Sequence, residues 1–119
     1  MMRASILLAI AAASAMSGCA ANNTKTLYHW GGYQSQLYAS LKGEGDPAAE
    51  LAALEAQAEK ARASGAALPP GFRAHLGMLN LKLGHYDEAR QMLEAEKAIF
   101  PESAQYMDFV MKSVSGKKS

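Results

Sequence analysis

Apolar and polar positions along the chain follow the spacing of α-helices separated by short turns. Apolar residues recur at helical spacing in about five stretches, and no stretch alternates apolar and polar residues over the length of a strand. The expected helices run over about residues 32–42, 47–64, 72–83, 87–100 and 103–115. Because the links between them are short, neighbouring helices should pack as antiparallel hairpins. The sequence therefore predicts an all-α fold.

Each expected helix has an apolar stripe that should face the core. Asp46 followed by Pro47 marks a helix start, because an aspartate side chain can cap free backbone amides and proline fits the first helical turn. Gly84 and Pro101 mark helix ends. In helix order, the stripe residues are Trp30, Tyr33, Leu37 and Leu41; Leu51, Leu54, Ala58 and Ala61; Phe72, Leu76, Leu79 and Leu83; Ala89, Leu93 and Phe100; and Tyr106, Phe109, Val110 and Val114.

Residues 1–18 have the layout of a secretory signal peptide: a charged start, an apolar run over residues 4–15 and an exit of small residues. The run is shorter than the roughly 20 residues that cross a bilayer as a helix. We therefore exclude residues 1–18 from the fold. Their removal takes away Arg3 and leaves eleven basic and eleven acidic side chains, a balance that gives no reason to expect a nucleic-acid partner.

Cys19 is the only cysteine of the chain, and a lone cysteine in an exported protein indicates intermolecular pairing or other thiol chemistry. Residues 16–19, MSGC, resemble the lipobox of bacterial lipoproteins, with Met16 where that family favours Leu. The resemblance implies cleavage before Cys19, a covalent diacylglycerol on its sulfur, an acyl chain on the new amine and no other cofactor. The alternative is an ordinary secreted protein with a free Cys19.

Two or three acyl chains suffice for stable membrane attachment without any protein contact. Ala20, and not Asp, follows the cysteine, which by resemblance to the sorting rule of enteric bacteria implies the outer membrane, on its periplasmic side. Residues 19–26 then form the lipidated N-terminus and a flexible tether. Residues 27–115 form the helical repeat-like domain, and residues 116–119 a disordered tail.

Residues 73–101 resemble one tetratricopeptide repeat, a pair of antiparallel helices. In that pattern Gly77 and Ala89 let the two helices approach closely, while Pro101 ends the second helix. The matching positions are Leu76, Gly77, Ala89, Leu93 and Pro101. The resemblance implies a tetratricopeptide-like hairpin.

Two residues depart from the repeat pattern: Asn80 stands where an aromatic residue is usual, and Glu96 where a small residue is usual. Glu96 falls on the face that carries Ala89 and Leu93, where an unpaired buried carboxylate is strongly disfavoured. One interpretation is that Glu96 leans outward from the edge of the stripe. The other is a structural hydrogen bond to the turn at residues 84–86 or to the final helix.

Three separated motifs resemble the DUF4810 family of small bacterial lipoproteins. They are HWGGYQSQLY at residues 29–38, PPGFRAHLG at 69–77, and EKAIFPES at 96–103 followed by Tyr106, Met107 and Asp108. Members of that family are often encoded beside a lipoprotein similar to the curli secretion channel and beside another small lipoprotein. The resemblance implies a part in a cell-envelope assembly, with other envelope lipoproteins as partners and no catalysis.

Four aromatic residues, Tyr28, Trp30, Tyr33 and Tyr38, cluster near the tether, where their rings could stack on a glycan or grip a partner. The alternative is that Trp30 and Tyr33 fill the top of the helical core, with Tyr28 and Tyr38 exposed. The same residues therefore fit either a binding surface or part of the core.

The remaining chemistry argues against an enzyme. His29, His75 and His85 lack the i, i+4 pairing of a helical metal site, and no GxSxG motif is present. We expect neither a metal nor a small-molecule substrate. The function expected is a membrane-anchored lipoprotein that acts as a non-catalytic protein-interaction or accessory subunit of a cell-envelope assembly. The alternative is a peptidoglycan- or glycan-binding module.

Overall fold

The computed structural model describes residues 26–116. These residues form five α-helices and one short 3-10 helix: α2 (Tyr33–Lys42), α3 (Pro47–Ala63), α4 (Phe72–Lys82), α5 (Tyr86–Ile99), η1 (Pro101–Ser103) and α6 (Ala104–Ser115). The predicted all-α fold is confirmed. The expected signal peptide, the lipid site at Cys19, the tether up to residue 25 and the tail from residue 117 lie outside the described residues.

Local chemistry explains where the helices begin and end. The Asp46 carboxylate accepts a hydrogen bond from the Ala49 amide at 3.1 Å, and Pro47 occupies the first turn of α3. Gly71 precedes α4 with a φ of 86°, a backbone conformation that favours glycine. Each of these signals depends on a few adjacent residues. For this reason the observed helix boundaries lie close to those expected from the sequence.

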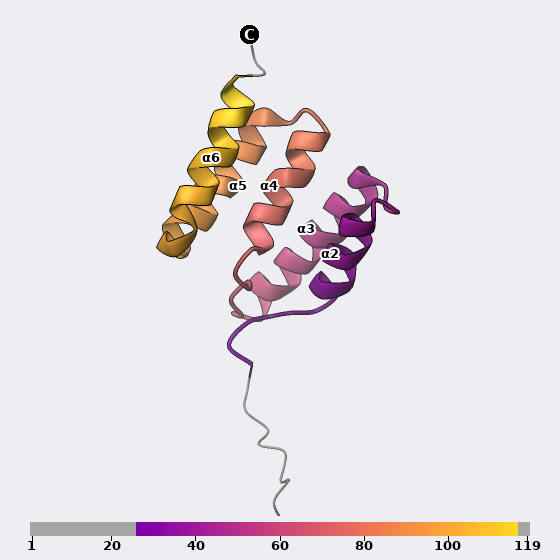
Figure 1. The fold of residues 1–119 in the computed structure, drawn as a ribbon. Coiled ribbons are helices and arrows are strands. Elements are labelled where there is room, and N and C mark those ends of the chain that lie inside the picture. The colour runs from indigo at the N-terminus through magenta and orange to yellow at the C-terminus, as the bar shows by residue number, and fades with distance from the viewer. Residues whose placement is uncertain (1–25, 117–119) are drawn as a thin grey trace, which may run out of the picture.

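The helices stack in chain order, each packed against the next. α2 pairs with α3, α3 with α4, α4 with α5, and α5 with α6. The chain turns back at each link, and α2 and α6 lie on the near side of α3 and α5 in Figure 1. The segment that leads into α2 lies at the lower end of this view, whereas the last turn of α6 lies at the upper end.

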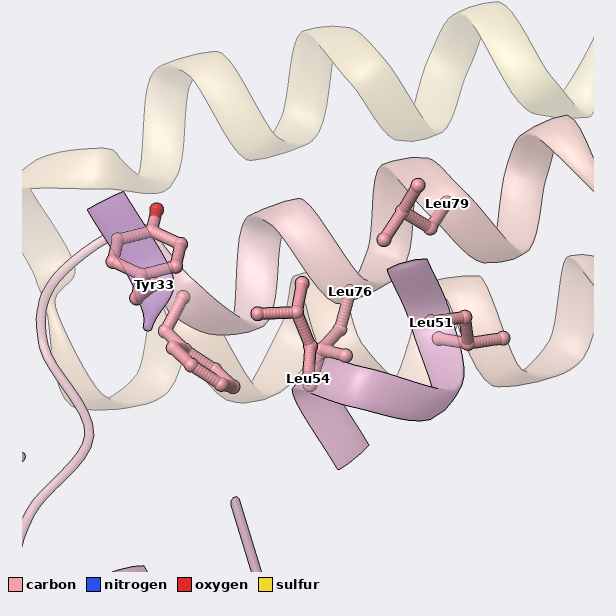
Figure 2. Packing of buried hydrophobic residues seen from close by; sticks show 6 residues of the cluster. Tyr33, Leu51, Leu54, Leu76 and Leu79 are labelled. Atoms are coloured by element: carbon pink, nitrogen blue, oxygen red, sulfur yellow. The ribbon is translucent and has the colours of Figure 1, made fainter. Parts of the chain in front are cut away.

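The larger hydrophobic cluster lies between α2, α3 and α4. Figure 2 shows Leu54 and Leu76 packed in its middle, with Tyr33 at one end. Burying each leucine contributes about 1.5–3 kcal/mol relative to leaving it exposed. The buried members are Tyr33, Leu51, Leu54, Phe72, Leu76 and Leu79.

A second cluster joins α5 to α6 through Leu93, Met107 and Val110. The stripe expected for the last helix is therefore wrong in part: Tyr106 and Phe109 are exposed, and Met107 is buried in their place. The physical reason is that α6 is rotated about its axis relative to the expected orientation, so that the side of this apolar helix that carries Met107 faces α5.

Two further stripe residues are not in the core. Leu41 is 79% exposed because α2 lies at one end of the stack, where its last turn has a neighbouring helix on one side only. Trp30 is 38% exposed, because it precedes α2 and lies across the end of the cluster. The expectation that Trp30 and Tyr33 fill the core together is correct for Tyr33 only.

The close approach of α4 and α5 depends on Gly77. A Cβ atom added to Gly77 would lie 2.9 Å from Cδ2 of Leu93 and 3.3 Å from the backbone oxygen of Ala89. Ala89 is fully buried at this crossing. Two small residues thus set the separation of these helices. The tetratricopeptide-like character of the hairpin stays a prediction.

We predict that Gly77→Ala lowers the free energy of unfolding by about 1–3 kcal/mol, because the new methyl group overpacks the crossing. Chemical denaturation measures this loss. In a Leu93→Ala background the same substitution should cost less, since the contacting methyl groups are gone. An equal loss in both backgrounds would contradict the overpacking explanation.

Candidate functional site

The segment before α2 is held against the link between α3 and α4. Tyr28 and Ala67 form an isolated parallel bridge, and the His29 amide donates a hydrogen bond to the Ala67 oxygen at 2.7 Å. From α3, the Gln57 side chain donates to the Trp30 oxygen at 2.6 Å. The aromatic residues of this segment are therefore fixed on the end of the helix stack.

The structure brings together three of the four aromatic residues singled out in the sequence. The rings of Tyr28 and Trp30 lie 6.3 Å apart edge to face, and those of Trp30 and Tyr33 lie 6.4 Å apart and stacked. Tyr33 is buried and its ring is 5.0 Å from that of Phe72. Tyr38 lies apart from this cluster, where the Lys42 ammonium is 5.0 Å from its ring centroid.

Glu96 is buried, with 2% of its surface exposed, so it does not lean outward. Its Oε1 accepts a hydrogen bond from the Gly71 amide at 2.6 Å. The structural hydrogen bond is therefore confirmed, but its partner is neither the turn at residues 84–86 nor the final helix, and the outward-leaning interpretation is wrong. The physical reason is that α5 runs back along α4, which places residue 96 beside the start of α4.

Gly71, Glu96 and Tyr33 meet at one point. A Cβ atom on Gly71 would lie 3.2 Å from the Tyr33 hydroxyl oxygen. Burial and the nearby Glu96 carboxylate raise the pKa of Tyr33 above its ordinary value. This point joins α2, the α3–α4 link and α5. The sequence carried two signals of this contact, a carboxylate on a core stripe and a glycine before a helix. Neither signal showed that the two residues pair with each other.

We predict that Glu96→Ala destabilises the domain by about 2 kcal/mol, because it leaves the Gly71 amide without its charged acceptor. Thermal unfolding followed by circular dichroism measures the effect. Glu94→Ala on the exposed side of the same helix is the matched control and should change stability by less than about 0.5 kcal/mol. Equal stability of the wild type and Glu96→Ala would refute the structural role.

A second buried carboxylate, Glu50 at the start of α3, faces His75 of α4. Its Oε2 lies 4.0 Å from Nε2 of His75, and the two side chains are 8% and 9% exposed. Neither atom makes a hydrogen bond with any described residue. Burial lowers the pKa of His75, while Glu50 opposes this shift and Lys82 adds to it. Periodicity gave no sign of this pair, because Glu50 and His75 are distant in sequence.

The lowered pKa of His75 makes stability depend on pH. The unfolded chain binds a proton at this histidine near about pH 6.5, whereas the folded chain resists it, so stability should fall as pH drops below that value. We predict that His75→Gln weakens the loss of stability between pH 7 and about pH 5. An unchanged profile in His75→Gln would count against this assignment.

Asn80, the other departure from the repeat pattern, is buried and stabilises the turn between α4 and α5. Its Nδ2 donates to the Leu76 oxygen at 2.9 Å, and its Oδ1 lies 3.2 Å from Nδ1 of His85.

The three histidines lie in separate surroundings. Within residues 26–116, no cluster of three potential metal ligands occurs.

An apolar groove crosses the face formed by α2, α4 and α6. It consists of two depressions of about 320 Å³ and 300 Å³ that share Met78 and Lys82. The first lies between α2 and α4 and reaches Tyr106 of α6; the second lies between α4 and α6. Exposed apolar side chains line or border it: Leu41, Met78, Tyr106 and Phe109. The groove can hold side chains of a partner, and of the aromatic residues singled out in the sequence as binding candidates only Tyr33 lines it.

Comparison with known proteins gives one match. The sequence model of a family described as Domain of unknown function (DUF4810) matches residues 27–110, which is more than half of the chain. The match extends from the aromatic segment before α2 into α6 and includes Tyr33, Gly71 and Glu96. No curated protein and no solved structure matches the chain.

Proposed function

Because the chain belongs to the DUF4810 family, whose function is unknown, we propose its function from its own residues: a lipid-anchored lipoprotein that acts as a non-catalytic interaction subunit of a cell-envelope assembly. The observation that carries this proposal is the apolar groove. Single exposed apolar residues are ordinary on a protein surface, but a group along one groove is typical of an interaction site. Here Leu41 and Tyr106, both more than half exposed, lie on the two helices that flank α4.

The anchor follows from the sequence around Cys19. The lipobox-like residues 16–19 supply a thiol for acylation, and Ala20 favours the periplasmic side of the outer membrane. Within residues 26–116, no helix is both long and apolar enough to span a membrane. A covalent lipid at Cys19 is then the feature that would hold the domain at a membrane surface, where its search for partners is confined.

A non-catalytic role is supported by the surroundings of the ionisable groups described. Glu96 is bonded to a backbone amide, and Glu50 and His75 are enclosed between α3 and α4. Of these three, only His75 lines a depression, the first one of the apolar groove, and Glu50, the acid that His75 faces, does not line it. We propose no cofactor besides the lipid. The partners proposed are other envelope lipoproteins, one of them similar to the curli secretion channel.

A glycan-binding role is the second candidate, and one depression favours it. Tyr28 and Phe100 line a hollow of about 430 Å³ together with Arg73 and with Arg62, which is paired with Glu59 of the same hollow at 2.6 Å. Aromatic faces and cations suit an acidic sugar polymer such as peptidoglycan. The four aromatic residues nevertheless form no single platform: Tyr33 is buried, and Tyr38 lies elsewhere on α2. We therefore place the interaction role first.

The anchor is tested by mass spectrometry and cell fractionation of the natural protein. We predict a polypeptide that begins at Cys19 and carries two or three acyl chains, recovered with the outer membrane. Cys19→Ser should lack the lipid. Cys19→Ala serves as a second variant that excludes an effect of the new hydroxyl. An unmodified thiol, or a purified chain that still begins at Met1, would overturn the proposal.

A further inference from the structure

Charge is divided unevenly between the two faces of the helix stack. α2 and α4 contain no acidic residue, and the one acidic residue of α6, Asp108, is paired with Lys97 at 2.7 Å. On the α3 and α5 side, Glu55, Glu59 and Glu88 line a depression of about 450 Å³. The two faces therefore differ in the sign of their charge as well as in the exposure of apolar side chains.

Lys82 is the charged residue at the centre of the apolar groove. It lines both depressions, is exposed, and forms no ion pair with any residue that the structure describes. Lys42 and Lys112 occupy the last turns of α2 and α6, as Lys82 does in α4. These three helices run in the same direction, so the three lysines lie toward the end of the stack away from the N-terminal segment (Figure 1), where Lys42 is paired with Glu44 at 3.5 Å.

This arrangement selects among the possible occupants of the apolar groove. The chain's own tether does not fit, because residues 20–25 are small and polar and include Lys25. A groove with apolar walls and an unpaired ammonium group favours a segment with two kinds of side chain. Apolar side chains fill the depressions, and carboxylates pair with the lysine. Potentials of opposite sign across an interface also suppress wrong partners.

We propose that the apolar groove docks an acidic amphipathic segment of a partner protein. Its apolar side chains would enter the depressions around Met78, and a carboxylate of the segment would lie at Lys82. The proposal rests on the interaction role proposed above and adds to it the surface used and the chemistry of the partner segment. The acidic depression between α3 and α5 is excluded as the docking surface for such a segment by its like charge.

The test is photo-crosslinking in intact cells that express the full chain. A photoreactive phenylalanine derivative replaces Tyr106 at the groove or, as the matched control, Ala56 on the exposed side of α3. We expect the Tyr106 probe to capture a protein, and the Ala56 probe to capture none. Mass spectrometry of the crosslinked peptide should show a segment in which Asp or Glu residues lie beside apolar residues.

Charge substitutions then test the recognition. Lys82→Glu should lower the yield of the Tyr106 crosslink about tenfold, which corresponds to losing one favourable charge contact. Lys60→Glu makes the same change of charge on α3 and should leave the yield unchanged. Circular dichroism of both variants confirms that the fold is kept.

The outcomes separate this inference from the function it rests on. Capture of a protein from Ala56 alone, or a Tyr106 crosslink to a neutral or basic segment, overturns the docking surface but leaves the interaction role standing. A Tyr106 adduct with lipid, or with a second copy of the chain, also overturns the docking proposal. Capture of no protein at either position overturns the interaction role itself.

Discussion

The arrangement of this domain depends on one buried carboxylate. Glu96 extends from α5 to the start of α4, accepts the Gly71 amide, and lies beside Tyr33 at the first turn of α2. Removing a carboxylate from water is costly unless hydrogen bonds satisfy it. Only Oε1 of Glu96 is bonded, while Oε2 makes no hydrogen bond with any described residue, so sliding of α5 that broke the Gly71 bond would leave the whole carboxylate unsatisfied. A single side chain thereby relates three elements that are far apart in sequence.

That constraint also shapes the surface. The start of α4 and the first turn of α2 meet at Glu96, and the first depression of the apolar groove lies between these two helices and reaches Tyr106 of α6. The aromatic rings of Tyr28 and Trp30 lie at the end of the helix stack where α2 begins, and Lys82 lies in the last turn of α4, toward the opposite end of the stack. The binding surface proposed here therefore begins beside this contact, because Tyr33 and Gly71 line its first depression, and extends along α4 to Lys82.

The sequence predicted the features that depend on residues close to one another along the chain. The helices follow from Asp46, Pro47 and the helical spacing of leucines, because capping and periodicity act over a few positions. It did not predict the partner of Glu96, the facing of Glu50 and His75, or the rotation that buries Met107 in place of Tyr106. Those depend on which residues lie opposite one another across helix contacts. Of the exposed apolar residues that line or border the groove, Leu41, Tyr106 and Phe109 had been noticed in the sequence, and all three had been expected in the core.

Hydrogen exchange at the Gly71 amide tests this account most directly. If the Glu96 carboxylate holds that amide in the folded domain, its exchange should be slowed as much as that of the Leu79 amide in the middle of α4. Exchange of the Gly71 amide at the rate of an unstructured glycine, while the Leu79 amide is protected, would contradict the account.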